Sequence, residues 1–89
     1  PGNTRWSMFK SGYDMATGQS LVIEWKRSDT TLAMRSTMSA PDAGGTGLFA
    51  TRTEQYYDND GTTLAQTVVY SLTYDNHRNV VSEQIVSVI

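Results

Sequence analysis

No stretch of ten or more residues in this chain repeats its apolar side chains with the 3.6-residue period of a helix. Stretches rich in Thr, Val, Tyr and Ile alternate instead with clusters of Gly, Asn and Asp, which is typical of strands joined by turns. We therefore predict an all-β chain with no substantial helix. The expected strands span residues 4–10, 20–27, 31–39, 48–57, 62–74 and 80–89.

The segments between the expected strands are short, with one exception. Because short connections join antiparallel neighbours, the chain is predicted to form a six-stranded antiparallel meander, strongly twisted or curled into a small open barrel. The exception is residues 40–47, where one Pro and three Gly predict a loop. We expect the 89 residues to form a single β domain, with a flexible N-terminus at residues 1–3.

The turn at Asp29–Thr30 allows the register of its two flanking strands to be predicted. A two-residue turn there would place Trp25 opposite Met34 and Glu24 opposite Arg35. Apolar residues would then share one face of the sheet, and an opposite-charge pair would lie on the other face. This agreement favours the register.

The sequence Asp58–Gly61 is the clearest turn signal in the chain, because Asp, Asn and Gly all tolerate turn geometry. A loop confined to these four residues would place Phe49 opposite Tyr70. The strand that follows, residues 62–74, is long for a small domain. We therefore expect a bend or bulge near Gln66–Thr67.

Charge and composition exclude several classes of function. The chain has seven basic and nine acidic residues, and the basic residues are scattered rather than gathered into a stripe. We therefore expect neither nucleic acid nor a membrane surface as a partner. No apolar run approaches the roughly 20 residues of a membrane helix. The lack of cysteine excludes disulfides, zinc ribbons and cysteine nucleophiles, and it leaves the compartment open.

Each candidate catalytic or metal-binding pattern in the sequence is better explained as an ordinary turn. His77 is the single histidine and lies in a predicted turn near Asp75, but no G-x-S-x-G elbow marks a nucleophilic serine. The acidic turn at Asp58–Gly61 would need calcium ligands at positions that hold Tyr56 and Thr67. We therefore predict no catalytic residue, no metal and no cofactor, and we lean toward a protein that is not an enzyme.

Tyr followed by Asp and a turn recurs at Tyr13–Asp14, Tyr57–Asp58 and Tyr74–Asp75. Residues 74–83 (YDNHRNVVSE) resemble one YD repeat of the large Rhs-type shell proteins. The resemblance covers about the last third of the chain, and Arg78 stands where the repeat usually has Gly. The first half shows nothing similar, so no function is carried over from that family.

The apolar residues of such a sheet have little to pack against. The chain has 17 Ile, Leu, Val and Phe residues and no helix to cover them. Our leading hypothesis is a non-enzymatic interaction module that buries an apolar and aromatic sheet face, by forming a homo-oligomer or by docking on a larger protein assembly. The expected contact residues are Trp6, Trp25, Tyr56, Tyr57 and Tyr74.

Two alternatives remain open. The first is a small-ligand carrier, in which the curled sheet holds an apolar molecule. The second is a fragment or subunit of a larger enzyme. The apolar pocket of the carrier would be lined by Leu21, Ile23, Met34, Met38 and Phe49.

Overall fold

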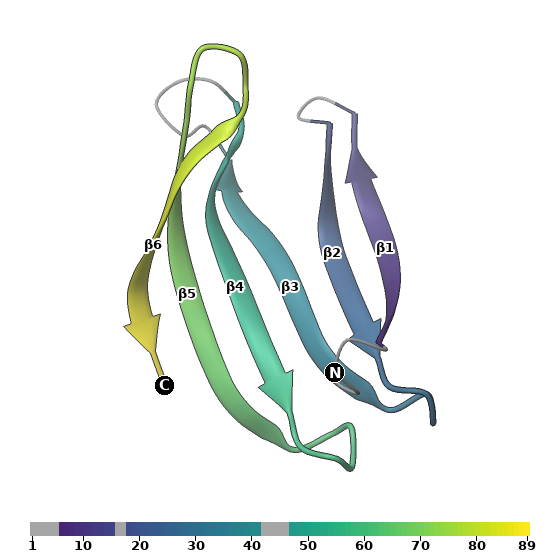
Figure 1. Ribbon diagram of the computed structural model, residues 1–89. Coiled ribbons are helices and arrows are strands. Elements are labelled where there is room, and N and C mark those ends of the chain that lie inside the picture. The colour runs from purple at the N-terminus through teal and green to yellow at the C-terminus, as the bar shows by residue number, and fades with distance from the viewer. Residues whose placement is uncertain (1–5, 16–17, 42–46) are drawn as a thin grey trace.

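The computed structural model describes residues 6–15, 18–41 and 47–89, and all of the regular structure in these ranges is β (Figure 1). Six antiparallel strands form one sheet, and their order in the sheet is their order in the chain. The predicted all-β meander is therefore confirmed. The strands are β1 (Ser7–Asp14), β2 (Gln19–Lys26), β3 (Leu32–Pro41), β4 (Phe49–Tyr57), β5 (Leu64–Tyr74) and β6 (Val80–Val88).

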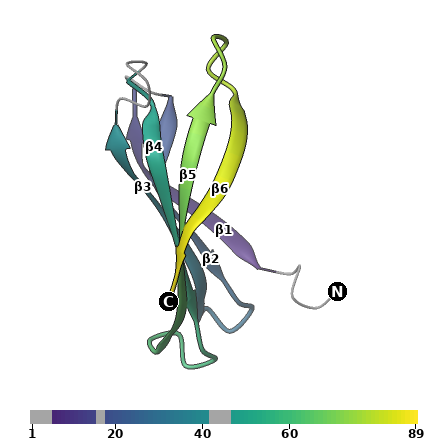
Figure 2. The same cartoon turned by 90° about the vertical axis from the view of Figure 1, so that its left-hand side faces the viewer.

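The sheet is twisted and open rather than closed into a barrel (Figure 2). Among the described residues β1 pairs only with β2 and β6 only with β5, so the sheet has two free edges. No second layer of regular structure covers either face within these ranges. The curl of the sheet itself must therefore bury the core.

One row of cross-strand partners identifies the face that carries much of this core. Residues that are directly opposite one another share a face of the sheet. In this row Ser36 is 3% exposed and Val68 is 7% exposed. We call this side the inner face. From β1 to β6 the row consists of Lys10, Ile23, Ser36, Glu54, Val68 and Val88.

The predicted register of β2 and β3 is confirmed, but the turn between them is different. Trp25 lies opposite Met34, as expected. The predicted two-residue turn at Asp29–Thr30 is wrong. Arg27 N donates to the carbonyl oxygen of residue 31, and this bond closes a three-residue loop, residues 28–30. A bulge that leaves Ala33 as the extra residue of β3 then restores the expected pairing.

The predicted register of β4 and β5 is wrong by three residues, and Phe49 does not lie opposite Tyr70. The turn at Asp58–Gly61 forms, with Gly61 N donating to the Asp58 carbonyl at 2.9 Å, but its loop is longer than expected. A bulge at Ala65 adds a further residue of offset. This bulge lies next to Gln66–Thr67, where the length of the strand predicts one.

Several strand boundaries also differ from expectation. β1 continues to Asp14, so residues 11–14 are strand rather than turn. Residues 40 and 41 belong to β3 rather than to the predicted loop. The flexible N-terminus expected at residues 1–3 and the loop residues 42–46 lie outside the described residues.

β2 and β3 pair over only part of their length, and Figure 1 shows them separating toward one end of the sheet. In the described part of the chain their ladder ends where Val22 lies opposite Thr37. β1 and β2 remain paired beyond this point, as far as Asp14 and Gln19. We call this end of the sheet the split end, and the opposite end, where the β2–β3 and β4–β5 turns lie, the clamped end.

Candidate functional site

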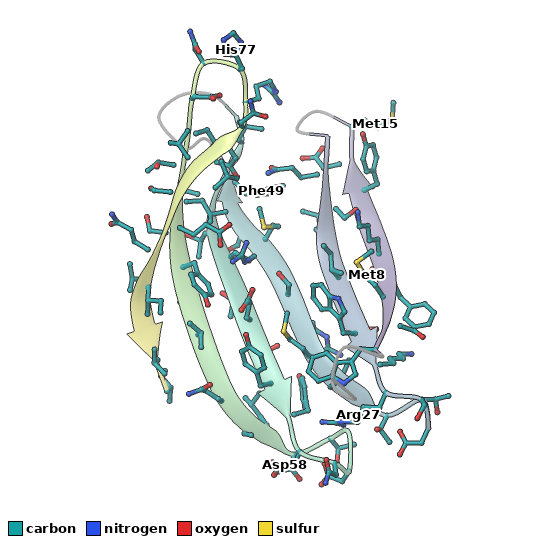
Figure 3. The ribbon with its side chains drawn as sticks, in the orientation of Figure 1. Met8, Met15, Arg27, Phe49, Asp58 and His77 are labelled. Atoms are coloured by element: carbon teal, nitrogen blue, oxygen red, sulfur yellow. The ribbon has the colours of Figure 1, made fainter. Side chains whose placement is uncertain are left out.

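Arg27 joins two hairpin turns at the clamped end, where Figure 3 shows it beside the turn that begins at Asp58. Its guanidinium donates to the carbonyl oxygens of Leu32 at 3.0 Å, Tyr57 at 2.7 Å and Asp58 at 3.1 Å. It also donates to Oγ1 of Thr31 at 3.2 Å. Because the acceptors belong to both turns, Arg27 fixes the β2–β3 hairpin against the β4–β5 hairpin.

Neutral groups join the strands at the split end. The Tyr74 hydroxyl donates to the carbonyl oxygen of Phe49 at 2.7 Å and accepts from Nε2 of Gln19 at 3.0 Å. Oε1 of Gln19 accepts from the Phe49 backbone N at 3.4 Å. These bonds connect β2 with β4 and β5 across the gap that the β2–β3 ladder leaves open.

A cavity of about 510 Å³ lies on the inner face near this gap. This volume is within the range of small-molecule sites. The lining residues come from both parts of the split sheet, and they combine apolar side chains with hydroxyl, amide and basic groups. They are Lys10, Tyr13, Gly18, Gln19, Ser20, Ile23, Ser36, Met38, Arg52, Leu72 and Val80.

The cavity includes part of the apolar pocket expected from the sequence. Ile23 and Met38 line it, whereas Leu21, Met34 and Phe49 are not among its lining residues. Phe49 is instead 5% exposed and belongs to the core. The polar part of the wall was missed, although the register of the first two strands would have indicated it, because Lys10 lies opposite Ile23.

A polar cluster surrounds Arg52 beside the cavity. Its guanidinium pairs with Glu83 and stacks 4.7 Å above the Tyr70 ring. Its buried Nε lies 3.1 Å from Oε2 of Glu54 but has no hydrogen-bond partner within the described ranges, so this contact is an ion pair without a directional bond. Oε1 of Glu54 also accepts from the Tyr56 hydroxyl at 2.7 Å. Arg52 is therefore balanced by two carboxylates.

The pKa shifts in this cluster keep each group in its usual charge state. Burial and the hydrogen bond to Glu54 raise the pKa of Tyr56 to about 12. Burial and the charge of Glu54 also raise the pKa of Tyr70. Burial alone would lower the pKa of Arg52, but Glu83 and Glu54 outweigh it and the pKa is raised. At neutral pH both tyrosines are therefore protonated and Arg52 is charged, so none of the three is poised to act as a base.

The two free edges of the sheet expose apolar side chains, and the larger set lies on the last strand. On β1, Met8 and Phe9 are each 52% exposed. On β6 and the residue after it, six apolar side chains are exposed by 44% to 84%, and we call them the β6 strip. The strip consists of Val80, Val81, Ile85, Val86, Val88 and Ile89.

The contact residues expected from the sequence do not form one surface. Trp25 and Tyr56 are half-buried on the inner face, on either side of one β3 residue, while Trp6 is half-buried just before β1. The Tyr57 hydroxyl accepts from Arg35 Nη1 at 3.2 Å on the opposite face. Tyr74 lies at the split end, as described above. The β6 strip was not among the expected contact residues, although the Val and Ile residues of the last strand indicated an apolar surface there.

The acidic residues of the turns stabilise those turns. Asp75 Oδ1 accepts from the backbone N of His77 at 2.8 Å, so this carboxylate bonds the backbone of His77. Asp60 accepts from the backbone N of Thr62 and Thr63 at 2.9 and 2.8 Å, and it also accepts from the Thr63 hydroxyl. The Thr63 bonds, with a smaller effect from Thr62, lower the pKa of Asp60 to about 2.

Comparison of the chain with protein-family models, with curated proteins and with solved structures finds no match. Within residues 6–15, 18–41 and 47–89, no three acidic or histidine side chains are grouped so that they could hold a metal ion. The same ranges contain no helix long and apolar enough to cross a bilayer. The features that point to a function are therefore the cavity and the β6 strip.

Proposed function

We propose that this chain is a non-enzymatic protein-interaction module that binds through the β6 strip, and that the occupant is the β6 strip of a second copy. The observation that carries the proposal is the exposure of five apolar side chains on the edge strand β6 and of a sixth at the residue after it. A free edge also presents unpaired backbone N–H and C=O groups, which makes a long apolar edge a template for another strand.

The contrast with β1 supports β6 as the contact strand. β1 carries Lys10 and Asp14, and charged side chains on an edge strand discourage edge pairing. β6 carries a single charged residue, Glu83. That carboxylate is already paired with Arg52 of its own chain, so the strip presents no unpaired charge to a second copy.

An antiparallel pair of β6 strands with its two-fold axis at Gln84 fits this charge pattern. Glu83 of one copy then lies opposite Ile85 of the other, so the two carboxylates do not face each other. Bulges at Val81 and Val86 interrupt the regular ladder on either side. Apolar contact, more than backbone hydrogen bonding, therefore supplies most of the association free energy.

Analytical ultracentrifugation at micromolar concentrations tests the proposal. We expect the wild-type chain to sediment as a dimer and the double variant Ile85→Asp, Val86→Asp to sediment as a monomer, because the new carboxylates would be buried near the axis and the first of them would lie opposite Glu83 of the second copy. The matched control is Met8→Asp, Phe9→Asp on the β1 edge, which should remain a dimer. Circular dichroism of both double variants checks that the sheet is retained.

Either of two results would reject this assignment. A wild-type chain that stays monomeric throughout the concentration series would remove self-association as the function. Equal loss of the dimer in the β1 and β6 double variants would show that β6 is not the specific contact.

A further inference from the structure

The apolar walls of the cavity come from four different strands. Ile23 lies on β2, Met38 on β3, Leu72 on β5 and Val80 on β6. A ligand in the cavity would therefore touch apolar side chains on both sides of the split. Such a wall favours a molecule with an aliphatic or aromatic body.

The cations of the wall differ in how they are balanced. Arg52 already holds Glu54 and Glu83. Lys10 is exposed, and no hydrogen bond or ion pair joins its ammonium group to any side chain in the described ranges. Among the residues that the structure describes, no acidic side chain lines the cavity. Lys10 therefore supplies the uncompensated charge of the wall.

The position of Lys10 places this charge close to the apolar wall. It lies directly opposite Ile23, which in turn lies opposite Ser36, so the three residues form one row across the inner face. Ser36 is 3% exposed and also lines the cavity. An ammonium group and a buried hydroxyl thus flank an apolar side chain at one wall, which suits a molecule with one anionic group and an apolar body.

We propose that the cavity binds a small amphipathic carboxylate, with the carboxylate contacting Lys10 and an alkyl body lying against Ile23, Met38 and Leu72. A single free lysine suits one compact anionic group, whereas multiply charged ligands usually need several cations or an arginine fork. This site is on the inner face, and it shares one residue, Val80, with the β6 strip.

Decanoate is the probe, with decanol as its uncharged counterpart. We expect decanoate to shift the methyl NMR signals of Ile23, Met38 and Leu72, and decanol to bind about tenfold more weakly. Lys10→Met should weaken decanoate binding by about tenfold and leave decanol unaffected. Lys10→Arg, which retains the charge, should keep the binding.

The matched control is Lys26→Met. Lys26 lies 5.3 Å over the Phe9 ring and does not line the cavity, so its loss should leave decanoate binding unchanged. The proposal is overturned if decanoate leaves the lining methyl signals in place. It is equally overturned if decanol binds as tightly as decanoate, or if Lys10→Met and Lys26→Met have the same effect, since the site would then not recognise the carboxylate through Lys10.

Discussion

The two ends of this sheet are joined in different ways. At the clamped end, one charged side chain, Arg27, donates four hydrogen bonds to two neighbouring turns. At the split end, neutral bonds among Gln19, Phe49 and Tyr74 connect strands whose ladder has already ended. The strands are therefore held tightly together at the clamped end, and they leave room for a cavity at the split end.

The difference shows how the two ends of a one-layer sheet can have different roles, with one end stabilising the fold and the other leaving space for a ligand. Hydrogen bonds from a charged donor are stronger than bonds between neutral groups. The end held by Arg27 keeps the hairpins in place, and the more weakly joined end leaves the inner face accessible. Variants at each end can test this division directly.

The largest effect is expected when the clamp is removed. Arg27→Ala deletes all four bonds, and we expect it to lower the free energy of unfolding by about 2–3 kcal/mol in urea titrations. Tyr74→Phe deletes the corresponding hydroxyl at the split end and should cost only about 1 kcal/mol. If the Tyr74 variant lost as much stability as the Arg27 variant, the two ends would not differ in the way proposed.

A smaller effect is expected from the contact between the two turns of the clamped end. Gly61 has a φ of +75°, and a Cβ at this position would lie 3.0 Å from both Leu32 N and Thr31 Cβ. We expect Gly61→Ala to cost about 2 kcal/mol, from backbone strain and displacement of the turn. Gly47 has a φ of +80°, but apart from its neighbours in the chain no atom of the described residues lies within 4 Å of a Cβ at this position, so Gly47→Ala should cost only about 1 kcal/mol. Equal losses in thermal or urea unfolding would show that the turns do not press on each other.

The smallest effect is expected in acid. The pKa of Asp60 is about 2 in the folded chain and lies below its ordinary value of 3.8. Because the folded pKa is depressed, the stabilisation is present above about pH 4 and is lost as the pH falls toward 2. Asp60→Asn should flatten the stability profile in this window more than Asp75→Asn does at the split end, where the pKa is also lowered. Urea midpoints measured from pH 2 to 5 compare the two variants.

The register of a hairpin could be predicted where the side chains alternate clearly. Trp25 and Met34 share one face of β2 and β3, and Glu24 pairs with Arg35 on the other, with Arg35 Nη2 2.9 Å from Glu24 Oε2. The bulge at Ala33 compensates for the difference in loop length, so the predicted pairs still form. The side-chain pattern therefore determined the pairing even though the local turn geometry was different.

The register of β4 and β5 failed because neither strand has a clear apolar alternation. Thr and other polar residues occupy most of β4, so the pairing followed the loop length. That length depends on Asp60, which bonds the backbone N of Thr62 and Thr63 and includes Thr62 in the loop. A turn predicted from Asp58–Gly61 alone does not indicate these side-chain bonds, so the length of the loop could not be predicted from it.

The candidate sites were harder to predict than the strands, because they depend on how the sheet curves and where it separates. Ile23 and Met38 were expected in a pocket and line the cavity. Arg52 lines the same cavity because residues from all six strands meet there, which no single strand pattern indicates. Arg27 bonds a turn that lies about thirty residues away in the chain, and no local sequence pattern indicates that the two come together.

The strictly consecutive strand order also has a consequence for folding. Every ladder joins strands that are neighbours in the chain, so each one closes a short loop at modest entropic cost. Assembly can begin at any hairpin and add one strand at a time, as in a repeat protein. The bond between Gln19 and Tyr74, which are 55 residues apart, forms only after the four strands from β2 to β5 are in place. Its formation therefore reports the assembly of these four strands rather than the formation of the first hairpin.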